Sequence, residues 1–540
     1  MQDRIFLHRD AFWIFTGALF LFTVVLMPEF QGMNARFALF AQEMMRNGPS
    51  CFPTTYGVPY PDYPATSTFL IYLLSVPLGK VTPLSAVLPS AIASALVLVV
   101  IYRIGALHSR KWGVWSVFFA LSTKSFFSYS RDISPDQYVS LVTVFSFYLV
   151  YSARVRGKRE NLSSLFPLLL AGFLFRGPLG LVIPAGVLCG FYLLERDFSR
   201  LLLFGGGALA LLTLASGVLL AAASSEGGET FVKQVIRMEA AGRITAASHG
   251  PGYYWGKGLV KYLPAYPLAL IVFMGFGRGL FRGSGEEMRL IRHSALWIVI
   301  ILGGLSIPGV KKMRYILPAV PPFALAAAWL FAGSTANRFL GKARSLLLGL
   351  FRVVPIGALL FSLSVLLFRK QWGFDFVRHG KIAFAIFVML VAVGEIGIPR
   401  LKKISGREAA RMAVTTVTLI LLTLCYSSPA YYARLESGPF IRAVSRELVR
   451  TKADLAFYRI PKDGLAVTFM ANLGRPIYPR FLSTPDQLAG TGRDDRIIIK
   501  EEDFSRLPEG LRRDFSILVR GRLEKRQCLL IRRKDPDWTG

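Results

Sequence analysis

Charged residues are scarce in this chain, and acidic residues are scarcer than basic ones. Only 18% of its 540 residues are Asp, Glu, Lys or Arg, whereas soluble domains average about 25%. The 33 acidic residues face 64 basic ones, which gives a formal net charge of +31. This shortage of charge argues against an ordinary soluble chain and directs attention to the apolar segments.

Cysteine is also rare, with four residues: Cys51, Cys189, Cys425 and Cys528. They show neither the spacing of a metal site nor that of a disulfide framework, so we expect no metal and no cofactor. A cleavable signal peptide is not expected either. The first apolar span, 11–27, lacks a small-residue cleavage site and is interpreted as a retained anchor.

Hydrophobic residues make up 53% of the chain and gather into long runs. Runs of this length cross roughly 30 Å of hydrocarbon as helices, because a helix satisfies its own backbone groups in lipid. We therefore predict an all-α polytopic membrane protein with a small C-terminal α/β soluble domain. About thirteen spanning helices are expected, near 11–27, 83–105, 112–129, 135–153, 163–175, 178–194, 201–223, 258–276, 290–307, 314–332, 346–368, 380–398 and 409–426.

The basic residues lie in the short loops between apolar spans. Every second loop is rich in Lys and Arg: 103–111, 154–159, 196–200, 278–292, 338–344 and 400–411. By the positive-inside rule, these loops and the N-terminus face the cytoplasm, and the C-terminal domain lies on the opposite, periplasmic side. The positive charge is therefore assigned to topology and anionic lipids, and no nucleic-acid partner is expected.

The sequence divides into two regions. We expect a transmembrane region, 1–426, with long periplasmic loops at 28–82 and 224–257, and a periplasmic α/β domain at 427–540. The first loop contains an amphipathic helix near 34–47, which either lies in the membrane interface or caps the helix bundle. In the domain, helix 438–451 precedes strand-like runs at 455–459, 465–469, 496–500, 515–519 and 528–531.

Polar groups that share the periplasmic face of the predicted topology suggest chemistry on a lipid-linked sugar. Arginine and lysine near a membrane surface suit phosphate or pyrophosphate, and the candidates are Arg36, Arg176, Lys311, Lys312 and Arg314. Carboxylates act as bases or orient hydroxyls, and the candidates are Asp136, Asp62, Asp132 and Glu29. The candidate cavity, sugar or lipid contacts are Tyr60, Tyr63, His249, Tyr253, Tyr254 and Tyr315.

Each of these residues also has a structural interpretation. Ser134-Pro135-Asp136 is typical of a helix start, with Ser as N-cap, Pro at the first position and Asp in the first turn. Lys311 and Lys312 suit anchoring to lipid head groups. His249 suits a solvated loop, and the aromatic run beginning at Tyr253 suits a belt at the membrane interface.

Taken together, the chain resembles bacterial C-type glycosyltransferases of the dolichyl-phosphate-mannose protein mannosyltransferase superfamily, in the branch that contains the lipid A aminoarabinose transferase. The resemblance rests on four motifs in order along the chain. These are Arg36-Phe-Ala with Glu43-Met44, the turn Arg176-Gly-Pro178, His249 with Pro251, Tyr253 and Tyr254, and the run Lys311 to Pro322.

The resemblance implies a polyprenyl-phosphate sugar donor, an active site on the periplasmic side of a bacterial inner membrane, and metal-independent, inverting transfer to a glycan, lipid or protein acceptor. By position, Arg36, Arg176, His249 and the 311–315 cluster would contact the donor phosphate or close over it, and Asp136 matches the family's second acidic position. The sequence departs from the family pattern at two places. Met33 and Asn34 stand where relatives have Asp-Glu, and Asp62-Tyr63-Pro64 stands where they have Glu-Lys-Pro-Pro.

Three interpretations of the missing aspartate remain open. In the first, Glu29, Asp62, Asp132 or Asp136 supplies the acid. In the second, the acceptor is a phosphate oxygen that is already ionised, so that catalysis rests on positioning and on cations around the leaving group. In the third, the protein is an inactive relative that binds lipid or an assembly partner. A transporter or flippase ranks below these, because the charges gather at one face and no internal repeat is visible.

Overall fold

The protein is described from a computed structural model, which covers residues 2–26, 28–241, 249–277, 279–282, 285–333, 338–368 and 380–534. The chain forms two compact units, each assembled from distant segments. The membrane unit consists of Met1–Val25, Pro61–Ser67 and Val87–Ser427. The second unit consists of Leu26–Tyr60, Thr68–Ala86 and Ser428–Gly540.

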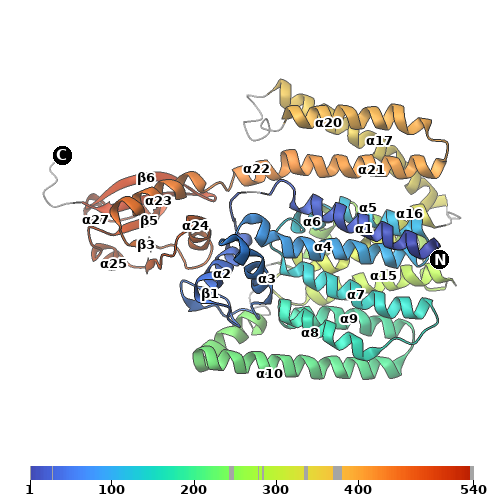
Figure 1. Ribbon diagram of the computed structural model, residues 1–540, viewed down its shortest axis with the longest axis horizontal. Helices are drawn as coiled ribbons and strands as arrows, with labels where there is room; N and C mark the ends of the chain where they lie inside the picture. Colours follow the sequence, from blue (N-terminus) through green and yellow to red (C-terminus); the bar gives the residue numbers. More distant parts are fainter. Residues whose placement is uncertain are drawn as a thin grey trace. The chain divides into compact units, whose positions relative to one another are not determined.

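The membrane unit is helical throughout the part of the chain that the structure describes (Figure 1). Its α-helices are α1 (Gln2–Thr23), α4 (Pro83–Ala106, which begins in the second unit), α5 (Arg110–Ser122), α6 (Lys124–Tyr129), α7 (Pro135–Val155), α8 (Leu165–Arg176), α9 (Pro178–Leu194), α10 (Phe198–Ile236), α12 (Tyr253–Lys261), α13 (Ala265–Phe276), α14 (Gly279–Arg282), α15 (Glu286–Ser306), α16 (Val320–Ala332), α17 (Arg338–Leu367), α20 (Gly380–Ala392) and α21 (Ile404–Leu422). Short 3₁₀ and π segments complete it at Leu162–Ser164, Arg237–Ala241, Met313–Ala319, Val393–Gly397, Ile398–Arg400 and Thr423–Ser427.

Among the described residues, eight helices are long and apolar enough to cross a membrane, or nine if one bent pair counts as a single span. Three shorter apolar helices, 66–78, 162–176 and 178–194, fall below that length. The polytopic helical architecture is therefore confirmed. The figure of thirteen crossings stays a prediction, because a short helix reaches across only part of roughly 30 Å of hydrocarbon.

Two expected boundaries are wrong in detail. The span predicted at 258–276 is broken into α12 and α13, which bend by 113°. Pro264 lies at the break, and proline cannot donate the hydrogen bond that would continue a helix. The segment 224–257, predicted as a long loop, begins as helix, because α10 continues to Ile236 after non-helical backbone at Gly227 and Gly228. Gly228 has φ of 64°, which glycine adopts without steric cost.

Helix α16 is the centre of the membrane unit. All twelve residues from Val320 to Phe331 are buried, because α16 packs against α5, α13 and α15. Trp115 of α5 stacks on Phe331 with ring centroids 3.9 Å apart. The indole N–H of Trp112 donates to the carbonyl of Leu325 at 2.8 Å, so the aromatic contact is accompanied by a satisfied polar group.

The second unit contains a five-stranded sheet and its covering helices (Figure 1). The strand order is β4-β3-β5-β7-β6, with bounds β3 (Leu455–Tyr458), β4 (Arg480–Leu482), β5 (Arg496–Lys500), β6 (Phe515–Leu523) and β7 (Arg526–Arg533). Strands β4, β3 and β5 are parallel, and β7 pairs antiparallel with both β5 and β6. The other elements are α2 (Met33–Asn47), β1 (Thr54–Thr55), β2 (Val58–Pro59), α3 (Thr66–Ser75, which begins in the membrane unit), the 3₁₀ turn Val76–Leu78, α22 (Ser428–Ala433), α23 (Gly438–Thr451), α24 (Leu465–Leu473), α25 (Pro485–Ala489), α26 (Glu501–Ser505) and α27 (Glu509–Arg513).

The elements predicted for the second unit agree with the structure except at one run. Helices near 34–47 and 438–451 are confirmed, as are four of the strands. The run 465–469 is wrong as a strand, because it lies in α24 between Gly464 and Gly474, which both have positive φ. Seven of the nine residues of α24 are buried, so the sequence shows no alternation that would separate helix from strand. Strand β4 was not predicted.

The cysteines give a test of this fold. Cys51 is exposed, whereas Cys528 is buried in β7, where burial raises the pKa of its thiol to about 12. We expect a membrane-impermeant maleimide to label Cys51 in the folded, detergent-solubilised protein and to leave Cys528 unlabelled until denaturant is added. Mass spectrometry of tryptic peptides measures both. Equal labelling of the two cysteines before denaturation would contradict the packing of the sheet.

Candidate functional site

Asp136 is held between two arginines in the membrane unit. It lies in the first turn of α7, where Ser134 occupies the N-cap position and Pro135 the first helical position, as predicted. Its Oδ1 accepts a hydrogen bond from Nε of Arg176 at 2.9 Å, and its Oδ2 lies 3.0 Å from Nε of Arg314. The Asp136 side chain is only 6% exposed. A buried carboxylate requires partners of this kind, since it has lost its water.

Arg176 is enclosed by aromatic rings. Its guanidinium carbon lies 4.7 Å from the ring centre of Tyr63 and 5.4 Å from that of Tyr315. The Arg176 side chain is 5% exposed, so both cation–π contacts are made away from water, where they are strongest. Burial raises the pKa of the Tyr63 phenol, which therefore stays protonated and cannot serve as a base.

The hairpin of α8 and α9 places Arg176. The chain turns at Gly177, which has φ of 60°, and Pro178 then begins α9. Gly172 and Gly180 face each other across the hairpin, and a Cβ on either would overlap the carbonyl of the other. Glycine at both positions thus lets the two backbones touch, as small residues do in membrane helix pairs.

Glu239 is a buried carboxylate of this region that the sequence analysis did not single out. A Cβ on Gly177 would lie 3.0 Å from Oε2 of Glu239 and 3.2 Å from Cβ of Tyr63. Glu239 is 8% exposed and belongs to the π-helix that follows α10. The only sequence signal was its position within the long segment 224–257.

The other predicted residues of the membrane unit lie around this cluster or serve the backbone. Asp62 is half-buried, and its Oδ1 accepts the N–H of Tyr63 at 3.0 Å. Lys311 is buried and donates from Nζ to the carbonyl of Pro308 at 2.6 Å, whereas Lys312 is exposed. Asp132 lies beyond α6, where its N–H approaches the carbonyl of Tyr129 at 3.4 Å.

Two tyrosines at the start of α12 differ in burial and in their contacts. Tyr254 is fully buried, and its hydroxyl donates to the carbonyl of Lys312 at 3.3 Å and accepts the N–H of Lys312 at 3.1 Å. Tyr254 thus fixes the backbone next to Arg314. His249 is exposed, and its ring lies 4.0 Å from that of Tyr253. Neither ring is part of the Asp136 cluster.

Arg36 and Tyr60 belong to the second unit and have a separate network. Nη2 of Arg36 lies 3.4 Å from Oδ1 of Asp463, and its guanidinium lies 5.3 Å from the ring centre of Tyr60. The hydroxyl of Tyr60 donates to Oδ2 of Asp463 at 3.3 Å. Asp463 was not predicted, because nothing in a polar loop of the C-terminal segment marks it as the partner of α2.

Two carboxylates near the start of the second unit hold backbone amides. Glu29 accepts the N–H groups of Ser437 and Gly438, at 3.0 Å and 3.1 Å, at the N-terminus of α23. Glu43, the acidic residue of the Glu-Met motif, is 3% exposed and accepts the N–H groups of Tyr56 and Gly57. Glu29 therefore caps a helix, whereas Glu43 holds the turn between β1 and β2.

Of the predicted residues, the structure thus brings together Asp136, Arg176, Arg314, Tyr63 and Tyr315, with Asp62 next to Tyr63. In the described ranges, no group of three or more His, Cys, Asp and Glu residues is arranged to hold a metal ion. The assembled cluster combines two guanidinium groups with the carboxylate between them and with aromatic faces.

Part of the membrane unit matches a known protein family. Residues 63–220, which include Asp136 and Arg176, match the family described as dolichyl-phosphate-mannose-protein mannosyltransferase. A solved structure, ArnT from Cupriavidus metallidurans bound to undecaprenyl phosphate, superposes with a TM-score of 0.69 over 97% of both chains, at 16% identity. This chain therefore has the fold of that structure.

Sequence relatives of this chain match over shorter regions. The undecaprenyl phosphate-alpha-4-amino-4-deoxy-L-arabinose arabinosyl transferase of Aeromonas hydrophila subsp. hydrophila is 26% identical over 280 residues, which is 48% of this chain and 47% of that one. An uncharacterized protein of Aquifex aeolicus is 30% identical over 210 residues, or 38% and 39% of the two chains. The matches span less than half the length of these curated relatives.

The cap at α23 gives a prediction that separates structure from catalysis. We expect Glu29→Gln to lower the stability of the protein by about 1 kcal/mol, because two amides lose their anionic acceptor at a helix N-terminus. Thermal unfolding in detergent measures the change, and Glu226→Gln, at an exposed carboxylate, is the control. An unchanged unfolding temperature in Glu29→Gln would contradict the capping role.

Proposed function

We propose that this chain is a membrane glycosyltransferase that moves a sugar from polyprenyl phosphate to a periplasmic or lipid-linked acceptor, without a metal and with inversion at the sugar carbon. The observation that carries the proposal is the buried carboxylate of Asp136 with Arg176 and Arg314 on its two oxygens. The similarity in fold to a structure bound to undecaprenyl phosphate supports the choice of donor.

The two arginines have different roles in this proposal. Arg176 is buried beneath Tyr63 and Tyr315 and has no open face for a ligand, so it anchors Asp136. Arg314 is the more exposed of the two, at 13% of its side chain, and its ion pair with Asp136 runs through Nε. Its terminal N–H groups are therefore assigned to the donor phosphate, since guanidinium binds phosphate oxygens through paired N–H donors. Asp136 acts as a positioning residue.

The proposed transfer is a displacement at the sugar carbon. The acceptor oxygen forms a bond to that carbon while the bond from carbon to the phosphate oxygen breaks, and polyprenyl phosphate leaves with the electron pair. Arg314, with Lys312 nearby, stabilises the charge on the departing phosphate. If the acceptor is a hydroxyl, its proton passes to a carboxylate, for which half-buried Asp62 is our candidate. If the acceptor is an ionised phosphate, no base is needed.

An inactive relative that binds polyprenyl lipid is the second candidate. It is favoured by Met33 and Asn34, which replace the Asp-Glu pair of the family and form the first turn of α2. In that case the Arg314 cluster would bind undecaprenyl phosphate, and no sugar would be released from any donor. Binding measured by titration with undecaprenyl phosphate, together with absent turnover of lipid-linked sugars, would select this candidate over the transferase.

Substitution at the cluster tests the transferase proposal. We expect Arg314→Gln and Asp136→Asn each to lower sugar transfer by about 100-fold or more in proteoliposomes, because a preorganised group at the leaving phosphate is removed or misplaced. Transfer is measured by mass spectrometry of the product of an undecaprenyl-phosphate sugar donor. Glu408→Gln is the control, since it breaks another partly buried ion pair of the membrane unit, with Arg344. Full transfer by folded Arg314→Gln would refute the proposal.

The role of Asp62 as the base is tested separately. We expect Asp62→Asn to abolish transfer to a hydroxyl acceptor and to leave transfer to a phosphate acceptor within about threefold of wild type, because only the hydroxyl has a proton to lose. The rates with the two acceptor classes are compared at the same pH. Equal loss with both classes would show that Asp62 positions other groups and is not the base.

A further inference from the structure

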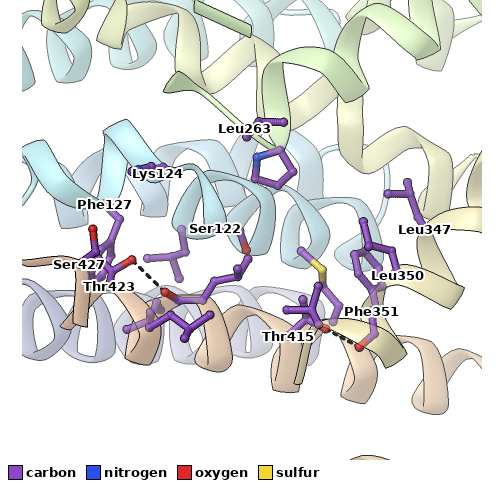
Figure 2. Close-up of a pocket in the computed structure, with 17 residues that line it drawn as sticks. Ser122, Lys124, Phe127, Leu263, Leu347, Leu350, Phe351, Thr415, Thr423 and Ser427 are labelled. Atoms are coloured by element: carbon purple, nitrogen blue, oxygen red, sulfur yellow. Dashed lines mark hydrogen bonds between the residues drawn. The ribbon is translucent and has the colours of Figure 1, made fainter. Parts of the chain in front are cut away.

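A cavity of about 370 Å³ lies in the membrane unit, apart from the arginine cluster. It is bounded by the ends of α5 and α6, the break between α12 and α13, and the facing sides of α17 and α21 (Figure 2). Most of its lining is apolar and includes Phe127, Leu263, Leu350, Phe351 and Leu419. The proposed transfer reaction makes no use of this cavity.

Three hydroxyl groups in the lining are satisfied by the protein itself. The hydroxyls of Ser122 and Thr416 share a hydrogen bond of 2.9 Å, Thr415 donates to the carbonyl of Phe351, and Thr423 donates to the carbonyl of Leu419. Lys124 is different, because its side chain is exposed and its ammonium forms no hydrogen bond or ion pair with any residue in the described part of the chain. The lining thus offers hydrocarbon along its length and a single cation.

Lys124 lies at one end of the cavity, and the apolar lining extends away from it. Figure 2 shows Lys124, Thr423 and Ser427 at one end of the cavity and Leu347 and Leu350 at the other. Along α21 the lining runs from Met412 to Thr423, which is about 17 Å at 1.5 Å per residue. This length matches one leaflet of a bilayer whose hydrocarbon core is about 30 Å thick.

We propose that this cavity binds one acyl chain of an anionic glycerophospholipid, whose phosphate pairs with Lys124. The volume decides between this ligand and the donor chain. At about 30 Å³ for each water-sized group, the cavity accommodates roughly a dozen methylene groups, which suits one acyl chain of a single leaflet. A whole polyprenyl chain is several times longer, so the donor is assigned to the arginine cluster and not to this site.

The position of Lys124 gives the lipid a structural role. The N–H of Lys124 donates to the carbonyl of Leu263 at 3.0 Å, and the hydroxyl of Ser125 donates to the carbonyl of Lys261 at 2.8 Å. Helix α6 also packs against the 3₁₀ helix Met313–Ala319, which contains Arg314. A lipid that fills the cavity therefore supports one side of α6, whose other contacts reach the segment next to the arginine cluster.

Native mass spectrometry of the full-length protein in detergent tests this site by lipid binding, independently of sugar transfer. The probes are phosphatidylglycerol and phosphatidylcholine, added in turn. We expect wild type to bind one phosphatidylglycerol in preference to phosphatidylcholine. Lys124→Ala should weaken phosphatidylglycerol binding by about fivefold, which corresponds to one cation at a lipid phosphate, and should weaken phosphatidylcholine binding by less, because the choline cation already neutralises the phosphate of that lipid. Lys80→Ala, at an exposed lysine, is the control.

A second pair of variants tests the apolar part. Leu350→Trp fills the lining and should abolish the bound lipid, whereas Leu346→Trp, on the same helix but outside the lining, should retain it. Val354→Phe serves if Leu350→Trp fails to fold. The proposal is overturned if Leu350→Trp and Leu346→Trp bind alike, if Lys124→Ala changes neither lipid, or if undecaprenyl phosphate displaces the bound phosphatidylglycerol one for one.

Discussion

Burial of the Arg176 guanidinium is the constraint on which the rest of the site depends. A charged group that is 5% exposed has lost its hydration, and only opposite charge and polarisable faces can replace it. Asp136 supplies the charge, while Tyr63 and Tyr315 supply the faces. Because the same carboxylate reaches Arg314, one ion-pair network joins α7, the α8–α9 turn and the 3₁₀ helix before α16.

This network explains how a site can be rigid where the lipid matrix offers little support. The hairpin of α8 and α9 is closed by glycines at a backbone contact, and Tyr254 clamps the backbone of Lys312. Arg314 is therefore held by its ion pair with Asp136, and the backbone two residues before it is held by Tyr254. Groups fixed before a ligand arrives need no reorganisation when charge develops, which is the basis of electrostatic catalysis.

The carboxylates of the second unit show that acidic residues are not interchangeable. Glu29 and Glu43 both hold pairs of backbone amides, and Asp463 holds Arg36. Their oxygens meet needs of the local fold. Asp62 differs from the two glutamates, because it accepts one neighbouring amide, through Oδ1, and not a pair. Its side chain is half-buried. Assigning chemistry to carboxylates therefore depends on what each oxygen already binds.

Much of the architecture followed from the sequence alone. The apolar runs became helices, because lipid leaves backbone groups no other partner, and Ser134-Pro135-Asp136 began a helix as its residue types require. The alternating and β-branched runs of the C-terminal segment, such as Arg496–Lys500, became strands. Composition also separated the charged loops from the spans. The resemblance in motif order to the aminoarabinose transferase branch agreed with the fold.

Only the tertiary structure decided which of the candidate groups meet. Asp136 fitted both a helix cap and a catalytic acid, and the sequence could not choose, because its partners Arg176 and Arg314 lie in distant segments. The same holds for Glu29, whose amide partners are more than 400 residues away, and for the helix Leu465–Leu473, whose burial hid its periodicity. Local sequence sets backbone conformation through propensity and solvent. The pairing of charges depends on which distant segments the fold brings together, and no local sequence pattern encodes that.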